Sequence, residues 1–220
     1  MASVHITKLA AAERQLRAAI RMYFDGEDDL AIHTVASAAH HLLADLKADR
    51  GMDEAADSIL TSFFYAVRDY RRGTLPEYLL ADHAFLDWVR NLADQLPITA
   101  DSKIRDVSIT VPPQAVREFW KHQRKVANFL KHADHDRHAS ISLKDHDNLM
   151  LLIQCYCAYR DLTPKDLDNE GLVFEIYVGA REDNQSSCVE SQQEIVKKLR
   201  DVDESDRKRI CSFIIRNMNE

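Results

Sequence analysis

Residues 116–136 read VREFWKHQRKVANFLKHADHD, and placed on a helix this stretch separates into an apolar side and a basic side. A helix turns about once every 3.6 residues, so residues three or four positions apart share a side. The apolar side consists of Val116, Phe119, Trp120, Val126, Ala127 and Leu130. The opposite side carries Arg117, Lys121, Arg124, Asn128 and His132. Such a helix buries its apolar side against other helices, so we expect the rest of the chain to supply helical partners.

This basic stretch belongs to a chain that is acidic overall. Five Lys or Arg and one Glu lie between residues 117 and 131, which gives a local charge of about +4. The whole chain has a net charge of −7 at pH 7. The acidic total argues against a protein that coats nucleic acid non-specifically, but it allows a local basic patch.

The composition favours helices throughout. The 220 residues include only 5 Gly and 5 Pro, and Ala, Leu and charged residues dominate. We therefore predict an all-α fold, an irregular bundle of eight or nine helices. The expected helices cover roughly residues 3–24, 27–49, 53–72, 76–96, 116–131, 149–162, 172–178, 189–201 and 204–217. Residues 172–178, LVFEIYV, also suit a strand, but no neighbouring stretch offers a partner strand.

The expected organisation is a single domain over residues 1–220. The alternative is two lobes, 1–96 and 114–220, joined by an irregular segment at 97–113 that is rich in Thr, Ser, Asp and Pro. No stretch has the apolar length of a membrane span, and the N-terminus has no secretory pattern, so we expect a cytoplasmic protein without a membrane partner. The four cysteines have no zinc or redox spacing and are expected to be buried thiols.

Two histidines stand out in the expected second helix. His33 and His40 lie seven residues apart, and therefore close to the same side, away from the apolar stripe of that helix. Ala36 and Ala44 flank them, and such small residues let a second helix approach closely. The two histidines are thus expected either in a groove between helices or at the surface with ordinary hydrogen bonds.

The candidate catalytic residues are Arg124, Asn128 and His132, which repeat every four residues and stack along the helix. An imidazole with a pKa near neutrality can accept or donate a proton. A guanidinium can hold a phosphate with two hydrogen bonds, and an amide can orient either group. This combination suits metal-independent cleavage of RNA, in which the 2′-hydroxyl attacks the adjacent phosphate. The candidate phosphate-binding residues are Arg117, Lys121 and Lys125.

The segment RKVANFLKHAD, residues 124–134, resembles the signature region of the HEPN superfamily. The resemblance implies a small α-helical protein with an arginine, a polar residue and a histidine on one helix, and a dimeric, metal-independent RNase. Arg117 and His122 repeat the arginine–histidine pair, but they lie about 140° apart on an ideal helix. The layout is also similar to bacterial all-helical proteins of no assigned activity that have an early His-Thr, here at 33–34, and a later Lys-His-Ala-Asp, here at 131–134.

A His/Asp metal site is one alternative. Imidazoles and carboxylates crowd the polar loop that follows the basic helix, at His132, Asp134, His135, Asp136, His138, Asp145, His146 and Asp147. A catalytic zinc needs three converging ligands and an open position. The sequence has no HExxH and no paired Glu-x-x-His, and Asp and His also form turns and helix caps. Our expectation is therefore neither metal nor cofactor.

The other alternative is a regulatory or protein-interaction module without chemistry. A basic groove on a helical protein can bind RNA, but it can equally bind an acidic segment of a protein partner. An apolar helix face that pairs with its own copy would make a homodimer.

Overall fold

The computed structural model describes residues 5–75, 77–131, 137–143, 145–181 and 190–218, and regular structure in these ranges is entirely helical. The helices are α1 (Lys8–Asp25), α2 (Asp29–Asp49), α3 (Glu54–Arg72), α4 (Glu77–Leu80), α5 (His83–Gln95), the 3₁₀ helix η1 (Ile104–Asp106), α6 (Pro113–Gln123), α7 (Lys125–Lys131), α8 (Asp145–Leu162), α9 (Asp168–Arg181), α10 (Glu190–Arg200) and α11 (Glu204–Met218). The all-α class is confirmed, and the expected eight or nine helices are too few. Within those ranges no helix has both the length and the apolar character of a membrane span.

The chain forms two compact units. Unit 1 contains residues 1–52 and 124–220, and unit 2 contains residues 53–123. These boundaries differ from the expected lobes, because the chain leaves unit 1 after α2 and returns to it at the start of α7.

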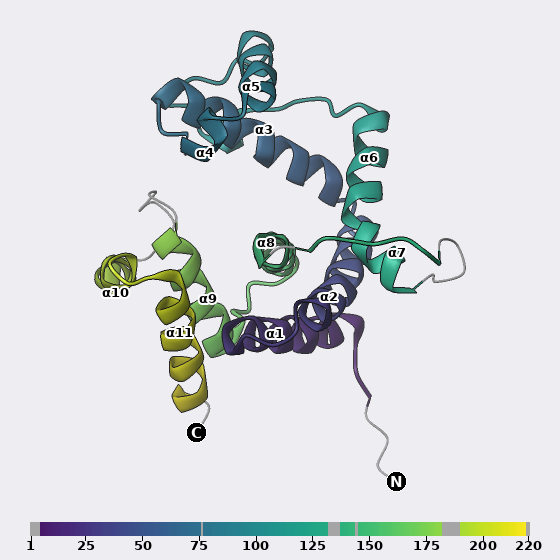
Figure 1. The fold of residues 1–220 in the computed structure, drawn as a ribbon. Coiled ribbons are helices and arrows are strands. Elements are labelled where there is room, and N and C mark those ends of the chain that lie inside the picture. Colours follow the sequence, from purple (N-terminus) through teal and green to yellow (C-terminus); the bar gives the residue numbers. More distant parts are fainter. Residues whose placement is uncertain (1–4, 76, 132–136, 144, 182–189, 219–220) are drawn as a thin grey trace. The chain divides into compact units, whose positions relative to one another are not determined.

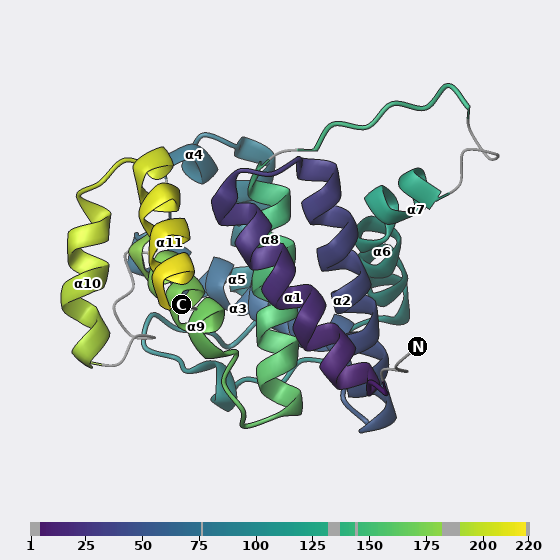
Figure 2. The ribbon, with the colours of Figure 1, turned by 90° about the horizontal axis from the view of Figure 1, so that it is seen from below.

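The core of unit 1 lies where α1, α2 and α8 pack together, with α9 and α11 completing it (Figures 1 and 2). Local signals set the ends of α1: the Thr7 hydroxyl accepts a hydrogen bond from the Ala10 amide, and Gly26 adopts the left-handed conformation at φ 69°. The fully buried large side chains of this core include Leu16, Ile20, Tyr23, Leu43, Leu152, Tyr159, Phe174 and Tyr177. The apolar run in α8 is thus core. Cys155 and Cys211 are buried thiols as expected, whereas Cys157 is exposed.

Helix α9 includes residues 172–178, so the expectation of a helix there is confirmed. Its first turn places the carboxylate of Glu170 fully inside the unit, against α1. Arg17 Nε donates to one Glu170 oxygen at 3.1 Å, and Arg21 Nη1 donates to the other at 2.5 Å. The buried negative charge is therefore neutralised by two guanidinium groups that keep partial contact with solvent.

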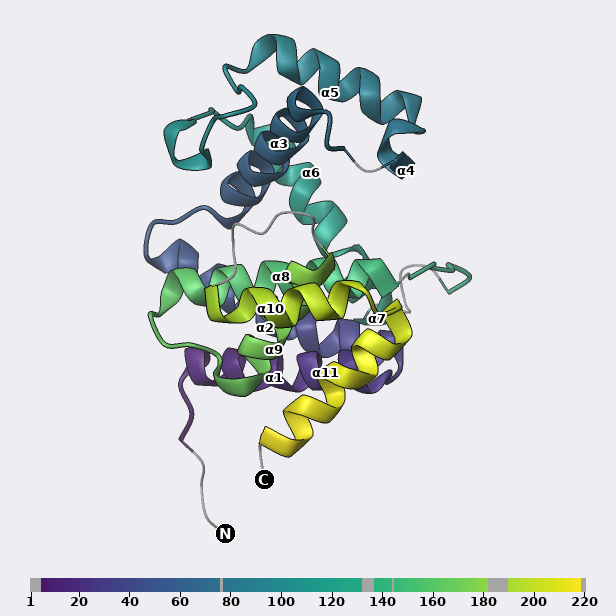
Figure 3. The same cartoon turned by 90° about the vertical axis from the view of Figure 1, so that its left-hand side faces the viewer.

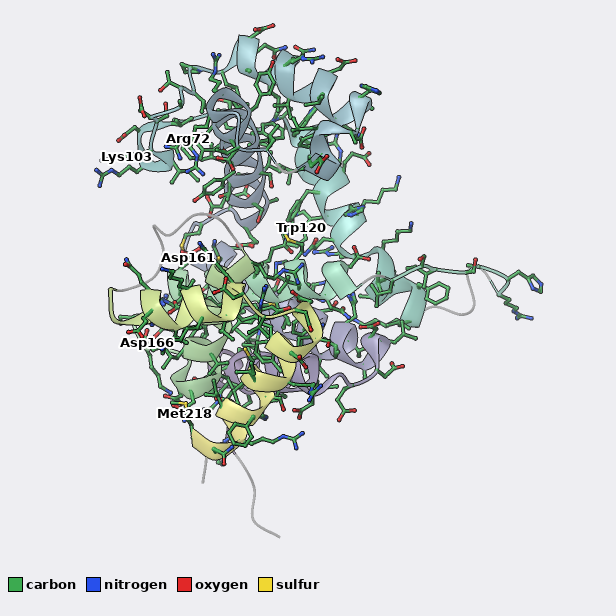
Figure 4. All side chains as sticks on the ribbon, turned by 60° about the vertical axis from the view of Figure 1, so that its left-hand side comes forward. Arg72, Lys103, Trp120, Asp161, Asp166 and Met218 are labelled. Atoms are coloured by element: carbon green, nitrogen blue, oxygen red, sulfur yellow. The ribbon has the colours of Figure 1, made fainter. Side chains whose placement is uncertain are left out.

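In unit 2, α3 packs against both α5 and α6 (Figure 3). Its small core consists of Phe64, Val67, Ala93 and Ile98. The expected helix over 76–96 is divided in two, because Asp82 caps α5 by accepting a hydrogen bond from the Phe85 amide. Arg72 and Lys103 lie near each other (Figure 4), because Arg72 Nε donates to the Ala100 carbonyl in the connecting segment.

The expected continuous helix from residue 116 is wrong. Helix α6 ends at Gln123, Arg124 forms a turn, and α7 begins at Lys125. Helix α6 packs on α3 in unit 2, whereas α7 packs on α2 in unit 1. The break occurs without Gly or Pro because each half packs on a different helix, which helical periodicity does not reveal.

Candidate functional site

Helix α7 places several of the predicted site residues on one side. The backbone N–H of Asn128 donates to the backbone carbonyl of Arg124 at 2.8 Å, so Arg124 belongs to the first turn of this helix. Asn128 lies one turn after Arg124, and Lys131 lies two turns after it, so all three side chains share an exposed side. The predicted pair Arg124 and Asn128 is therefore brought together, whereas His132 lies outside the described residues.

An imidazole that the sequence did not single out lies next to these cations. His41 is half-buried on α2, the helix against which α7 packs (Figure 2). Burial lowers the pKa of His41, and electrostatic interactions with Lys131, His40 and Arg124 lower it further. Asp45, one turn later on α2, raises it by a smaller amount. Arg124 and Lys131 are thus close enough to His41 for their charges to act on its ring.

The lowered pKa of His41 favours one protonation state of the site. Because burial and the neighbouring cations lower its pKa, the His41 imidazole favours the neutral form, which offers a lone pair that can accept a proton. The guanidinium of Arg124 and the ammonium of Lys131 attract an anion to the same place. An uncharged base close to two cations suits proton abstraction next to a bound phosphate.

His33 and His40 have a different position from His41. Both are buried on α2, and His33 contacts α8. His33 Nδ1 lies 3.1 Å from Asn148 Oδ1, and Asn148 Nδ2 donates to the carbonyl and the carboxylate of Asp29. Since the amide group is used by Asp29, the Asn148 oxygen accepts and His33 Nδ1 carries the proton. The expectation of a position between helices is confirmed for His33.

This arrangement predicts a loss of stability in acid. Burial lowers the pKa of His33 from 6.5, so below pH 6.5 the unfolded chain binds a proton that the folded chain resists. Stability should therefore fall as the pH drops from 6.5 through the folded-state pKa, and His33→Gln should reduce this dependence. Urea unfolding at about pH 5 and about pH 7.5 measures it. His5→Gln, at an exposed position of unit 1, is the control, and an equal acid sensitivity of His33→Gln and the wild type would contradict the assignment.

The predicted phosphate-binding residues are divided between the units. Lys125 is exposed on α7. Arg117 and Lys121 are exposed on α6 in unit 2, where Arg117 donates to Gln114 at 2.6 Å and Lys121 lies 3.9 Å from Glu118. Of the three predicted phosphate-binding residues, only Lys125 therefore lies on a helix of the α2–α7 cluster.

The described part of the chain contains no group of side chains that would form the predicted metal site. Within it, no three His, Cys, Asp or Glu side chains are grouped as metal ligands. His132, Asp134, His135 and Asp136 fall outside the described residues, as do the side chains of Asp145 and His146.

Sequence reasoning missed His41 although a weak signal was present. His40 and His41 are consecutive residues of a predicted helix, and the residues on either side of them are small or aliphatic. Because consecutive residues of a helix point in different directions, the two imidazoles had to face different surroundings. What the sequence did not contain was the identity of the helix that packs there. Comparison of the chain with family models, curated proteins and solved structures gave no match.

Proposed function

We propose that this chain is an RNA-binding protein that cleaves RNA without a metal ion, at the cluster formed by α2 and α7. The observation that carries the proposal is the packing of α7 on α2, which places the half-buried imidazole of His41 close enough to Arg124 and Lys131 for their charges to lower its pKa. An imidazole that can accept a proton and a guanidinium that can stabilise charge on a phosphate both suit phosphodiester cleavage by an internal hydroxyl.

In the proposed reaction, His41 accepts the proton of a ribose 2′-hydroxyl. The 2′-oxygen forms a bond to the adjacent phosphorus while the bond from phosphorus to the 5′-oxygen breaks. Arg124 and Lys131 bind the phosphate oxygens, on which negative charge increases, and Asn128 orients the phosphate through hydrogen bonds. A protonated group must supply a proton to the leaving 5′-oxygen, and His132, which follows Lys131 in the sequence, stays the predicted acid. The products are a 2′,3′-cyclic phosphate and a 5′-hydroxyl.

The experiment is incubation with total RNA in excess EDTA. We expect cleavage that survives chelation and is lost in His41→Ala. His122→Ala, which removes an exposed imidazole from α6, should cleave like the wild type. Loss of cleavage in His122→Ala but not in His41→Ala would transfer the site to the Arg117–His122 pair and contradict the proposal. Cleavage that requires a divalent cation would contradict it in favour of the metal alternative.

A second candidate, a non-catalytic interaction module, is favoured by the apolar residues on the surface of α11. Phe213 is 67% exposed, and Ile210 and Met218 are exposed on the same helix, the latter at its end (Figure 4). Absence of cleavage at high protein concentration, together with self-association that Phe213→Ser abolishes, would favour this module over the RNase.

A further inference from the structure

Three aromatic rings of unit 2 form a cluster that is separate from the small core of that unit. Helix α5 packs on α3 (Figure 3), and the Trp88 ring of α5 lies 5.4 Å from the Phe63 ring of α3 and 5.6 Å from the Phe85 ring, between centroids. The core of the unit contains none of these rings. Phe63 and Phe85 are half-buried, whereas Trp88 is 40% exposed. The cluster therefore presents a large ring to solvent, although burial of an aromatic side chain is favourable.

The exposed side of α5 around Trp88 carries no charge. Ala84 lies one turn before Trp88, and Asn91 and Gln95 lie about one and two turns after it. All three of these residues are exposed. Trp88 thus lies in the middle of an uncharged stripe that runs along the helix, and we call this stripe and the ring cluster the Trp88 surface.

The border of the Trp88 surface is acidic. Asp87 and Asp94 are exposed and seven residues apart, so they lie close to the same side of α5, about 100–120° around the axis from Trp88. Residues 77–101 contain five acidic residues and one basic residue, Arg90, a local charge of −4 with histidine counted neutral. Arg90 is already paired with Asp87, at 3.0 Å. This charge disfavours a nucleic acid and favours a cationic partner.

From this surface we infer that unit 2 docks an amphipathic helix of a protein partner, whose apolar side packs on Trp88 and whose lysines or arginines face Asp87 and Asp94. A tryptophan in an uncharged patch is the type of residue that contributes most to interface affinity, and carboxylates at the rim attract a cationic partner. A helix has the required pattern, because its apolar residues form one stripe and cations beside that stripe form a row. The inference is independent of the proposed RNase, whose residues belong to unit 1.

The test uses two dye-labelled peptides of about 14 residues that form amphipathic helices, one of leucine and lysine and one of leucine and glutamate. We expect the full chain to bind the lysine peptide in preference to the glutamate peptide. Trp88→Ala should weaken this binding about thirtyfold, as expected for an aromatic anchor. Phe213→Ala removes a more exposed ring from unit 1 and should bind like the wild type.

A charge reversal that keeps every aromatic ring tests the acidic border. Asp87→Lys/Asp94→Lys should weaken binding of the lysine peptide about tenfold and reduce its dependence on salt. Glu194→Lys/Asp201→Lys is the matched control in unit 1, because both residues are exposed and Glu194, like Asp87, forms an ion pair within its helix. The control should bind like the wild type, and an equal loss in both double variants would overturn the inference.

Tryptophan emission locates the bound peptide. The chain has two tryptophans, so Trp120→Phe leaves Trp88 as the only emitter. The lysine peptide should shift this emission to shorter wavelength and protect it from acrylamide. Failure to bind the lysine peptide, equal binding of both peptides, equal losses in Trp88→Ala and Phe213→Ala, or unchanged emission would each overturn the inference. Self-association of the chain that Trp88→Ala abolishes would overturn it in favour of a second copy.

Discussion

Replacing Arg124 by alanine is expected to slow RNA cleavage by about 10²–10³-fold, the loss that follows removal of one group that stabilises developing charge. The variant should also move the acid limb of the pH profile of kcat/KM, in which the rate rises with pH. That limb reports the pKa of the base in the free enzyme, and Arg124 lowers the pKa of His41. Without the guanidinium, the pKa of His41 rises and the limb moves to higher pH. Cleavage of a short fluorescent RNA from about pH 5 to pH 8 measures both effects.

The matched control is Arg14→Ala, which removes an exposed arginine from α1 in the same unit. It should change neither the rate nor the profile. Arg124→Lys should recover part of the rate, because a lysine restores the charge but not the two parallel hydrogen bonds of a guanidinium. A slower Arg124→Ala variant with an unshifted pH limb would contradict the assignment of His41 as the base.

The second large effect concerns stability, and it arises at Glu170. Replacing both Arg17 and Arg21 by methionine should destabilise the protein by about 3–5 kcal/mol, because the fully buried carboxylate loses both of its charged partners. Adding Glu170→Gln to this double variant should restore part of the loss, since the buried charge is then gone. Urea unfolding of the wild type, the double variant and the triple variant measures the difference.

An exposed ion pair in the same unit provides the comparison. Arg209 lies 2.8 Å from Asp206 on α11, and its side chain is 80% exposed. Arg209→Met should change the free energy of unfolding by about 1 kcal/mol or less. A double variant at Arg17 and Arg21 that is no less stable than Arg209→Met, or a triple variant less stable than the double, would show that the Glu170 charge is solvated in the protein.

Much of the secondary structure was predictable because its signals are local. Gly26 and Gly73 end α1 and α3 in the left-handed conformation, and apolar periodicity marked most of the helices between such signals. The interruptions at residues 81–82 and at Arg124 were not predicted. Asp82 is a polar residue in an otherwise periodic helix, and only its hydrogen bond to the Phe85 amide marks it as a cap. At Arg124 the apolar periodicity of the sequence continues through the break. The break depends on which unit each half belongs to, and the periodicity does not contain that information.

The candidate site was predictable to the extent that it is local. Arg124 and Asn128 are one helical turn apart, so sequence spacing alone placed them together. His41 lies far from them in the sequence and reaches them only because α2 packs against α7. Arg117 and Lys121 were assigned to the site by a continuous helix that the structure does not contain. Helical periodicity thus identifies the face that carries the cations, whereas the imidazole facing them depends on tertiary packing.

The most direct test of the α2–α7 cluster is an NMR titration of the His41 ring, assigned with His41→Gln, in the wild type and in the Arg124→Met/Lys131→Met variant. The two cations lower the pKa of His41, so the ring should titrate below pH 6.5 in the wild type and at a higher pH in the variant. A His41 ring that titrates at or above pH 6.5 in the wild type, or at the same pH in both proteins, would contradict the cluster.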